Sequence, residues 1–365
     1  MPRSINFCLL VFSCLMFALS SAFATIRYVD PGHYTTINLA YNDAVNGDTL
    51  LLAASTFNES LMSSKRLTIL GSGTSLTIMN GTVTLNTGSN GTVIEGMAIV
   101  SNYNTYAISL AAAVDSIAIR RCRTATVGDV GYACIFRIGD ANGGRLYMSD
   151  CTFEASFNDG RYAPRPLIAL LGDSTIVLNC IFASAPTGGV HATHGVGGSP
   201  RSLAMEGCVF LQTYEILQFT GSFPFFFVNN ILYDQAYNPP HWGTYPAAST
   251  WNYNASAGAL PPGDNAILLT QNPFVNSSPT NHYVFGTSDL HLDPTNGLPC
   301  INAGDPNQHD LDGSRSDLGI YGGQSPFIDS GAPNYPFVSS FTVPPSVTVG
   351  QTLPIQSQGR IGRGY

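Results

Sequence analysis

The sequence predicts an all-β protein built as a parallel solenoid, and three observations lead to this fold class. Charged residues make up only 10% of the 365-residue chain, and Lys65 is the only lysine. The wet faces of helices need such residues, so a mainly helical protein is excluded. Glycine and proline are abundant instead, as in chains of strands and turns. The other two observations are a repeated strand motif and a ladder of cysteines.

The repeated motif is a short unit that recurs five times between residues 116 and 232. Each unit has a cysteine or asparagine at one fixed place, with spacings of 29, 29, 28 and 22 residues. These residues are Cys122, Cys151, Cys180, Cys208 and Asn230. The residues directly before them are Arg121, Asp150, Asn179, Gly207 and Asn229. Four of these five are Asn, Asp or Gly, which tolerate a left-handed backbone. Each unit therefore predicts a strand, a one-residue corner and a second strand.

Apolar residues alternate on both sides of the predicted corner. In the third unit they are Ile176 and Leu178 before it, and Cys180 and Phe182 after it. Alternation indicates that one face of a strand is buried, so we expect these four side chains to point inward. One unit cannot bury this face alone, whereas stacked units can, at a strand spacing of about 4.8 Å. The result is a parallel β-solenoid.

The stacking also accounts for the cysteines. We expect the four ladder cysteines to be buried free thiols that pack like small hydrophobic residues. Equivalent side chains in a ladder point in parallel, which is a poor geometry for bridging. Disulfide bonds among them remain the alternative, because an even number of cysteines in an exported chain is typical of disulfides.

The ends of the chain indicate export and a capped solenoid. Residues 1–24 have the pattern of a signal peptide, with Arg3, an apolar stretch over Leu9–Leu19 and a cleavage site near Ala24. The apolar residues of 36–45 recur at helical spacing and predict a short capping helix at the open end of the solenoid. We expect the solenoid to cover residues 25–325. Residues 326–365 form a proline-rich linker and a short β-type tail, or the start of a truncated module.

Charge and hydropathy exclude two classes of partner. The net charge is −8 and no basic stripe is present, which excludes nucleic-acid binding. After the signal peptide no apolar run of about 20 residues follows, so we expect no transmembrane segment in the mature chain.

Several segments resemble a known family. Residues 34–40 and 46–52 look like the opening of right-handed parallel β-helix proteins of the pectin-lyase-like superfamily. Residues 229–233, 298–304 and 310–322 resemble the closing block of secreted bacterial proteins with right-handed β-helix repeats. The resemblance implies a right-handed parallel β-helix. It leaves the activity open, because this superfamily includes lyases, hydrolases, esterases and proteins without known activity.

A catalytic site for acidic polysaccharide has only weak candidates. A pectate-lyase-like site would need carboxylates that hold calcium and an arginine base. The candidates that lie close in sequence are Asp150, Glu154, Asp159, Arg161 and Arg165. The alternative is a loop between coils whose charges face water. His191 and His194 could likewise hold a metal, but an exposed glycine-rich loop is the favoured interpretation.

The aromatic run over residues 233–253 is a candidate ligand-binding loop. Flat rings presented from a rigid scaffold can stack on sugar rings. The candidate residues are Tyr237, Trp242, Tyr245, Trp251 and Tyr253. The alternative, which we weigh more heavily, is that the loop folds down and buries its rings in a small core.

The acidic stretch near the end of the solenoid is a candidate calcium site. Oxygen atoms of Asp310, Asp312, Ser314 and Asp317 could hold a hard cation. The favoured alternative is a turn whose carboxylates accept backbone N–H groups.

The sequence thus predicts a secreted or cell-surface monomer. We expect a non-catalytic scaffold that binds a polysaccharide or cell-surface glycan. The alternative is a polysaccharide lyase or glycoside hydrolase acting on acidic polysaccharide. We expect no certain cofactor, and calcium is the one candidate.

Overall fold

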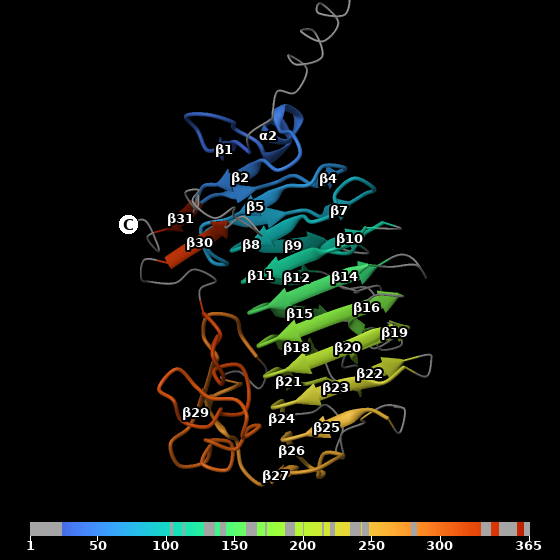
Figure 1. Ribbon diagram of the computed structural model, residues 1–365, viewed down its shortest axis with the longest axis vertical. Helices are drawn as coiled ribbons and strands as arrows, with labels where there is room; N and C mark the ends of the chain where they lie inside the picture. Colours follow the sequence, from blue (N-terminus) through green and yellow to red (C-terminus); the bar gives the residue numbers. More distant parts are fainter. Residues whose placement is uncertain are drawn as a thin grey trace, which may run out of the picture.

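The computed structural model of the protein confirms the parallel β-helix (Figure 1). The residues it describes are 24–102, 105–111, 114–127, 136–138, 144–157, 166–171, 174–186, 194–199, 201–213, 215–219, 223–233, 242, 248–278, 283–329, 337–342 and 356–360. Within these ranges the chain winds through three parallel sheets in turn, and successive coils stack along the long axis.

The three sheets are named A, B and C in the order in which each coil visits them. Sheet A contains β1 (Ile26–Val29), β2 (Thr49–Leu52), β5 (Thr68–Leu70), β8 (Val93–Glu95), β11 (Ile117–Arg120), β14 (Arg145–Ser149), β17 (Ser174–Leu178), β20 (Ser202–Glu206), β23 (Phe225–Val228) and β25 (Thr250–Asn252). Sheet B contains β3 (Thr56–Phe57), β6 (Ile78–Asn80), β9 (Ala98–Asn102), β12 (Arg123–Val127), β15 (Thr152–Phe157), β18 (Ile181–Pro186), β21 (Val209–Leu211), β24 (Ile231–Tyr233), β26 (Ala255–Ala257) and β27 (Ile267–Leu269). Sheet C contains β4 (Leu61–Ser63), β7 (Val83–Leu85), β10 (Ile108–Leu110), β13 (Phe136–Ile138), β16 (Pro166–Leu171), β19 (His194–Ser199) and β22 (Glu215–Phe219).

One-residue corners join sheet A to sheet B, as predicted. All five predicted corner residues have a left-handed backbone, with φ between 49° and 63°. Tyr253 forms a further corner at φ 53°, which the sequence analysis did not identify. Backbone hydrogen bonds link successive corners, for example from Asn179 N–H to the carbonyl of Glu206. The repeated left-handed residue thus turns each coil at the same place.

The predicted register of the strands before the corner was wrong. Val177 is fully buried, whereas Ile176 is 45% exposed and Leu178 is half-buried. After the corner, Cys180 and Phe182 are buried as expected. A left-handed residue bends the chain, so strict alternation does not continue through it. The inward positions on either side are therefore three residues apart, at Val177 and Cys180.

The cysteine ladder is confirmed as a column of buried free thiols. Cys122, Cys151, Cys180 and Cys208 are buried and form no disulfide. An aromatic column runs beside them in sheet B, where the Phe182 and Phe210 rings stack with centroids 4.6 Å apart. Such stacking at the strand spacing adds to the stabilisation that comes from burial.

Two buried asparagines continue the cysteine column toward the end of the solenoid. Asn230 Oδ1 accepts a hydrogen bond from Cys208 N–H at 2.8 Å, and Asn254 Oδ1 accepts one from Asn230 N–H at 3.0 Å. The Asn254 amide donates to the carbonyl of Phe227 at 2.8 Å. These amides satisfy main-chain groups at the corner, as buried polar groups must.

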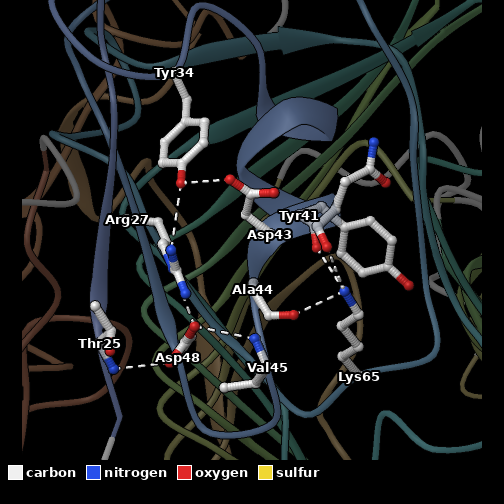
Figure 2. Close-up of polar contacts among 10 residues, drawn as sticks. Thr25, Arg27, Tyr34, Tyr41, Asp43, Ala44, Val45, Asp48 and Lys65 are labelled. Atoms are coloured by element: carbon white, nitrogen blue, oxygen red, sulfur yellow. Dashed lines mark hydrogen bonds and ion pairs between the residues drawn. The ribbon is translucent and has the colours of Figure 1, made fainter.

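The N-terminal end carries the predicted cap. Helix α2 (Ile37–Asp43) buries Ile37 and Ala40 against the first coil. Glu59 accepts hydrogen bonds from the first backbone N–H groups of α2, including Ile37 N–H at 2.7 Å. At the other end of α2, the Lys65 ammonium group donates hydrogen bonds to the carbonyl oxygens of Tyr41 at 2.7 Å and Ala44 at 2.8 Å (Figure 2). Opposite charges at the two ends complement the helix dipole.

The C-terminal block packs beside the solenoid rather than over its end (Figure 1). It spans residues 274–329 and includes the antiparallel strands β28 (Phe274–Asn276) and β29 (Asp289–Leu292). Its apolar side chains form a second core with the outer face of sheet B, and Tyr283 and Leu290 belong to the same buried cluster as Ile181 and Val209. Sheet B is therefore buried on both faces along β18, β21, β24 and β26, whereas Thr56 in β3 and Asn80 in β6 are exposed. The tail contains an antiparallel pair, β30 (Phe337–Thr342) and β31 (Gln356–Arg360).

Among the described residues, the helix found is too short and too polar to cross a membrane.

Candidate functional site

The outer face of sheet A contains a cleft with a volume of about 750 Å³. It extends over strands β11, β14, β17, β20, β23 and β25, which are neighbours in the sheet. At a strand spacing of about 4.8 Å, six strands span about 24 Å. The cleft is thus long enough for an extended ligand with several repeating units.

The floor of the cleft is an apolar row. Its residues share one register position and follow one another from strand to strand. They are Ala118, Tyr147, Ile176, Ala204 and Phe226. Ile176 is 45% exposed and Phe226 is 37% exposed, so their apolar surfaces are open to a ligand. Ala204 lies between the larger side chains of Ile176 and Phe226 and leaves a recess there.

A polar row borders the apolar floor. It begins each strand or directly precedes it, and it contains Ser116, Arg145, Ser174 and Ser202. Hydroxyl groups in such a row can both donate and accept hydrogen bonds. The cleft therefore presents apolar surface on its floor and hydroxyl groups along one side.

The one charged side chain among the described lining residues is Arg145. Its Nη2 atom lies 3.0 Å from Asp115 Oδ2 and donates to Ser116 Oγ at 2.8 Å. The hydrogen bonds from Arg145 hold the pKa of the Asp115 carboxyl well below its usual range. Arg145 is thus partnered by a carboxylate next to the cleft, whereas the Arg120 guanidinium lies 5.3 Å from the centre of the Tyr147 ring in the floor.

The carboxylates proposed for catalysis lie elsewhere. Asp150 is a corner residue between β14 and β15, and its Oδ1 atom is buried without a hydrogen-bond partner. Burial raises its pKa to about 7, although Arg121 and Arg120 lie close enough to oppose the shift. Arg121 itself forms an ion pair with Glu95. Asp150 is therefore a carboxyl group beside arginines, at a corner rather than in the cleft.

Glu154 belongs to a different surface. It lies in β15 on the side of sheet B that the C-terminal block covers, and it accepts two hydrogen bonds from Arg123 at 3.0 and 2.8 Å. The Arg123 guanidinium also lies 4.3 Å from the centre of the Phe285 ring. The remaining candidates, Asp159, Arg161 and Arg165, lie outside the described residues, as does His191. His194 begins β19.

The aromatic candidates separate into core and border residues. Trp251 is 4% exposed, in register with the inward-facing Phe227 and 4.6 Å from its ring. The structure thus places Trp251 in the core instead of on an exposed loop, because it belongs to strand β25. Trp242 packs edge-on against it at 6.0 Å. Tyr253 is the partly buried corner residue, with Arg315 5.3 Å above its ring. Tyr237 and Tyr245 lie outside the described residues.

The acidic loop of the C-terminal block forms a network with backbone groups. Asp310 accepts hydrogen bonds from the N–H groups of Asp317 and Gly323. Asp312 accepts hydrogen bonds from the N–H and the hydroxyl group of Ser314, at 2.9 and 2.6 Å. Asp317 accepts a hydrogen bond from Asn302 N–H at 2.6 Å. In the part of the chain that the structure describes, no three His, Cys, Asp or Glu side chains are grouped as a metal site. Calcium binding here stays a prediction.

Sequence reasoning missed the cleft for the same reason that it misplaced the strand register. Ile176 was expected to face the core, and Tyr147 and Phe226 occupy the equivalent outward place in their own units. The sequence did contain an indication that Trp251 faces the core. Residues 250–257 repeat the strand and corner pattern of residues 226–233, which puts Trp251 at the place of the inward-facing Phe227.

The comparisons with known proteins are sparse. No family model matches the chain, and no curated protein matches it. Among solved structures, the chain is similar to one described as the crystal structure of pectate lyase Pel9A. The TM-score is 0.45 at 13% sequence identity, over 81% of this chain and 95% of that chain.

Proposed function

We propose that this protein is a secreted or cell-surface, non-catalytic scaffold that binds glycans in the cleft on sheet A. The observation that supports it best is an apolar floor over five adjacent strands that is bordered by the hydroxyl groups of Ser116, Ser174 and Ser202. Sugar rings have the same two-sided character, with apolar C–H faces and polar edges. Apolar surface with a few placed polar groups is also typical of ligand sites in general.

The shape of the floor favours a chain over a single sugar. Tyr147 and Phe226 lie three strands apart, which corresponds to about 14 Å. A ligand that contacts both rings must extend past Ile176 and Ala204. An oligosaccharide can do so while its hydroxyl groups reach Ser174 and Ser202.

The chemistry of the lining favours binding over catalysis. Glycoside hydrolysis uses a pair of carboxyl groups on either side of the bond that breaks. The described residues that line the cleft include no Asp, Glu or His, and the arginine among them is paired with Asp115. Binding needs none of these groups.

A polysaccharide lyase or hydrolase remains the second candidate, and the Asp150 corner is the observation that favours it. A buried carboxyl group with a pKa near 7 beside arginines is typical of functional sites. In this interpretation Asp150 acts beside Arg120 and Arg121, whereas Glu154 is paired with Arg123 on a different surface.

A glycan array followed by titration of any bound oligosaccharide tests the proposal. Phe226→Ser and Ile176→Ser should each weaken binding by about tenfold or more, since each removes apolar contact of about 1.4 kcal/mol or greater. Met62→Ser is the matched control, because Met62 is an exposed apolar residue of sheet C, which takes no part in the cleft. Equal affinities for all three variants would refute the cleft as the site.

The same glycans separate the two candidate functions. The scaffold should leave a bound oligosaccharide intact on prolonged incubation, with and without calcium. Cleavage of the glycan that is abolished by Asp150→Asn, with binding retained, would establish the enzyme instead. No binding to any glycan would defeat both candidates.

A further inference from the structure

The first described residues of the chain are fixed to a buried carboxylate. The main-chain nitrogen of Thr25 lies 2.8 Å from Asp48 Oδ1 (Figure 2). The other oxygen of Asp48 accepts hydrogen bonds from Val45 N–H at 3.0 Å and from Arg27 Nε at 3.2 Å. Thr25 thus supplies the shortest of the three contacts to this carboxylate.

Asp48 is fully buried, so the donors around it decide whether its charge is tolerated. A buried carboxylate is costly unless it is paired and hydrogen-bonded. Its positive partner, Arg27, contacts only one of its oxygens and is shared with the Tyr34 hydroxyl at 3.3 Å. The other oxygen contacts the uncharged main-chain N–H of Thr25. A positive charge at this nitrogen would complete the pairing.

Thr25 is also the residue with which the sequence predicts the mature chain to begin. We propose that cleavage after Ala24 converts the Thr25 nitrogen into an α-ammonium group that forms an ion pair with Asp48, so that export processing itself completes the N-terminal cap. The inference rests on the predicted signal peptide and is independent of the proposed glycan binding.

The covalent step is an ordinary peptide hydrolysis by a signal peptidase. The bond between the Ala24 carbonyl carbon and the Thr25 nitrogen breaks, and water supplies the oxygen of the new Ala24 carboxylate. The Thr25 nitrogen gains protons and becomes an ammonium group at neutral pH, since an α-amino group has an ordinary pKa of about 7.7–8.0.

The surroundings of Thr25 fit this change without rearrangement. Its carbonyl accepts a hydrogen bond from Thr49 N–H at 2.9 Å, and the next residue, Ile26, already pairs with Thr49 in sheet A. The nitrogen is therefore held in place from its carbonyl side. Ala24 and Thr25 are both exposed, so the additional ammonium protons can reach water.

The charges around the pair allow the sign of its pH dependence to be stated. The groups nearest to it are Arg27, Tyr34, Asp43 and Arg66, of which Arg66 lies beside Gly47. The adjacent carboxylate should raise the pKa of the ammonium group in the folded protein above its unfolded value. The added stability is then fully present below about pH 7.7 and is lost as pH rises through the folded pKa.

The test compares three chains of otherwise identical sequence by urea unfolding at pH 6 and pH 10. One begins with Thr25 and a free amine, the second begins with N-acetylated Thr25, and the third begins with Ala24. Acetylation keeps the N–H donor but removes the charge, and the extra alanine moves the charge by one residue. At pH 6 we expect the free Thr25 chain to have a folded-to-unfolded ratio about tenfold higher than either of the other two chains. This factor corresponds to about 1.4 kcal/mol in the free energy of unfolding. The difference should vanish at pH 10.

Asp48→Asn supplies the matched control. In that background, acetylation should change the unfolding equilibrium at pH 6 by less than about twofold, because the charged partner is gone. If this variant does not fold, the pKa of the Thr25 amine in the wild-type fold, followed by NMR, gives the same answer. A value at or below that of an unfolded chain would overturn the proposal. An exported protein whose mature N-terminus is not Thr25 would overturn it as well.

Discussion

The ammonium nitrogen of Lys65 lies 2.7 Å from the carbonyl oxygen of Tyr41 and 4.4 Å from the centre of the Tyr41 ring. The same ammonium group contacts the carbonyls of Asn42 and Ala44 at 3.2 and 2.8 Å. The only lysine of the chain therefore terminates the only helix among the described residues. A helix end leaves carbonyl groups short of partners inside the helix, and one cation contacts three carbonyls here.

Replacing Lys65 should destabilise the N-terminal cap. Lys65→Met keeps most of the apolar stem but removes the charged donor, and we expect a loss of about 1.5–3 kcal/mol in the free energy of unfolding. Urea unfolding followed by circular dichroism measures it. Arg201→Gln, which removes an exposed positive charge, should change the free energy by less than about 0.5 kcal/mol. Equal effects of the two substitutions would contradict the capping role of Lys65.

The carboxyl group of Asp150 predicts an unusual pH dependence. Its pKa is raised by burial to about 7 in the folded protein, so its ionisation opposes folding. The protonated form is favoured in the fold, so stability from this group is fully present below about pH 3.9, the unfolded value, and is lost as pH rises from there through about 7. Asp150→Asn should therefore stabilise the protein by more than about 1 kcal/mol at pH 8 and by clearly less at pH 5. Asparagine also suits the left-handed corner, since Asn179 occupies the equivalent place.

The measurement is the free energy of unfolding of wild type and variant at both pH values. A stabilisation of the same size at pH 5 and pH 8 would mean that the asparagine improves the corner conformation without removing a charge. A loss of stability at pH 8 would show that the ionised carboxylate is favourable beside Arg121.

The parts of the fold that the sequence predicted are those repeated in every coil. The corner residues and the buried cysteines recur with one residue type at a fixed place, so local chemistry alone identifies them. The direction in which Ile176 points could not be predicted in this way, because the left-handed residue at Asn179 interrupts the alternation. The cleft on sheet A depends on that direction and was missed with it.

The second core could not be predicted for a different reason. Tyr283 and Leu290 share a buried cluster with Ile181 and Val209 across a large separation in sequence, and no repeat relates the two segments. The aromatic loop was predicted from composition, but Trp251 lies in strand β25 and packs in the main core, so neither the binding loop nor a small core made by the loop describes it. Composition indicates that aromatic rings gather in a region, whereas only the register of β25 decides which of them is buried.

The ladder cysteines should be unreactive in the folded protein. Burial raises the pKa of Cys208 to about 12 and that of Cys122 and Cys180 above the ordinary thiol value, so almost no thiolate forms at neutral pH. Iodoacetamide should leave the four ladder residues unmodified in the native state. In urea without reductant it should modify all of them. Peptide mass spectrometry reads out both states, and a ladder cysteine that reacts only after reduction would reveal a disulfide.

The buried Asn254 side chain should not tolerate a charge. Its oxygen accepts two hydrogen bonds from Asn230, one from N–H and one from Nδ2, both at 3.0 Å, and its amide donates to the carbonyl of Phe227. Asn254→Asp keeps the acceptor but places a carboxylate against the Phe227 carbonyl in the core. We expect a loss of more than about 3 kcal/mol in the free energy of unfolding at pH 7, and a smaller loss at pH 4, where the new carboxyl group can be protonated. Asn58→Asp is the control, because exposed Asn58 also accepts a hydrogen bond, from Asn80 at 2.8 Å, and should lose less than about 0.5 kcal/mol. Similar losses for both substitutions would show that the asparagine column does not hold the end of the solenoid together.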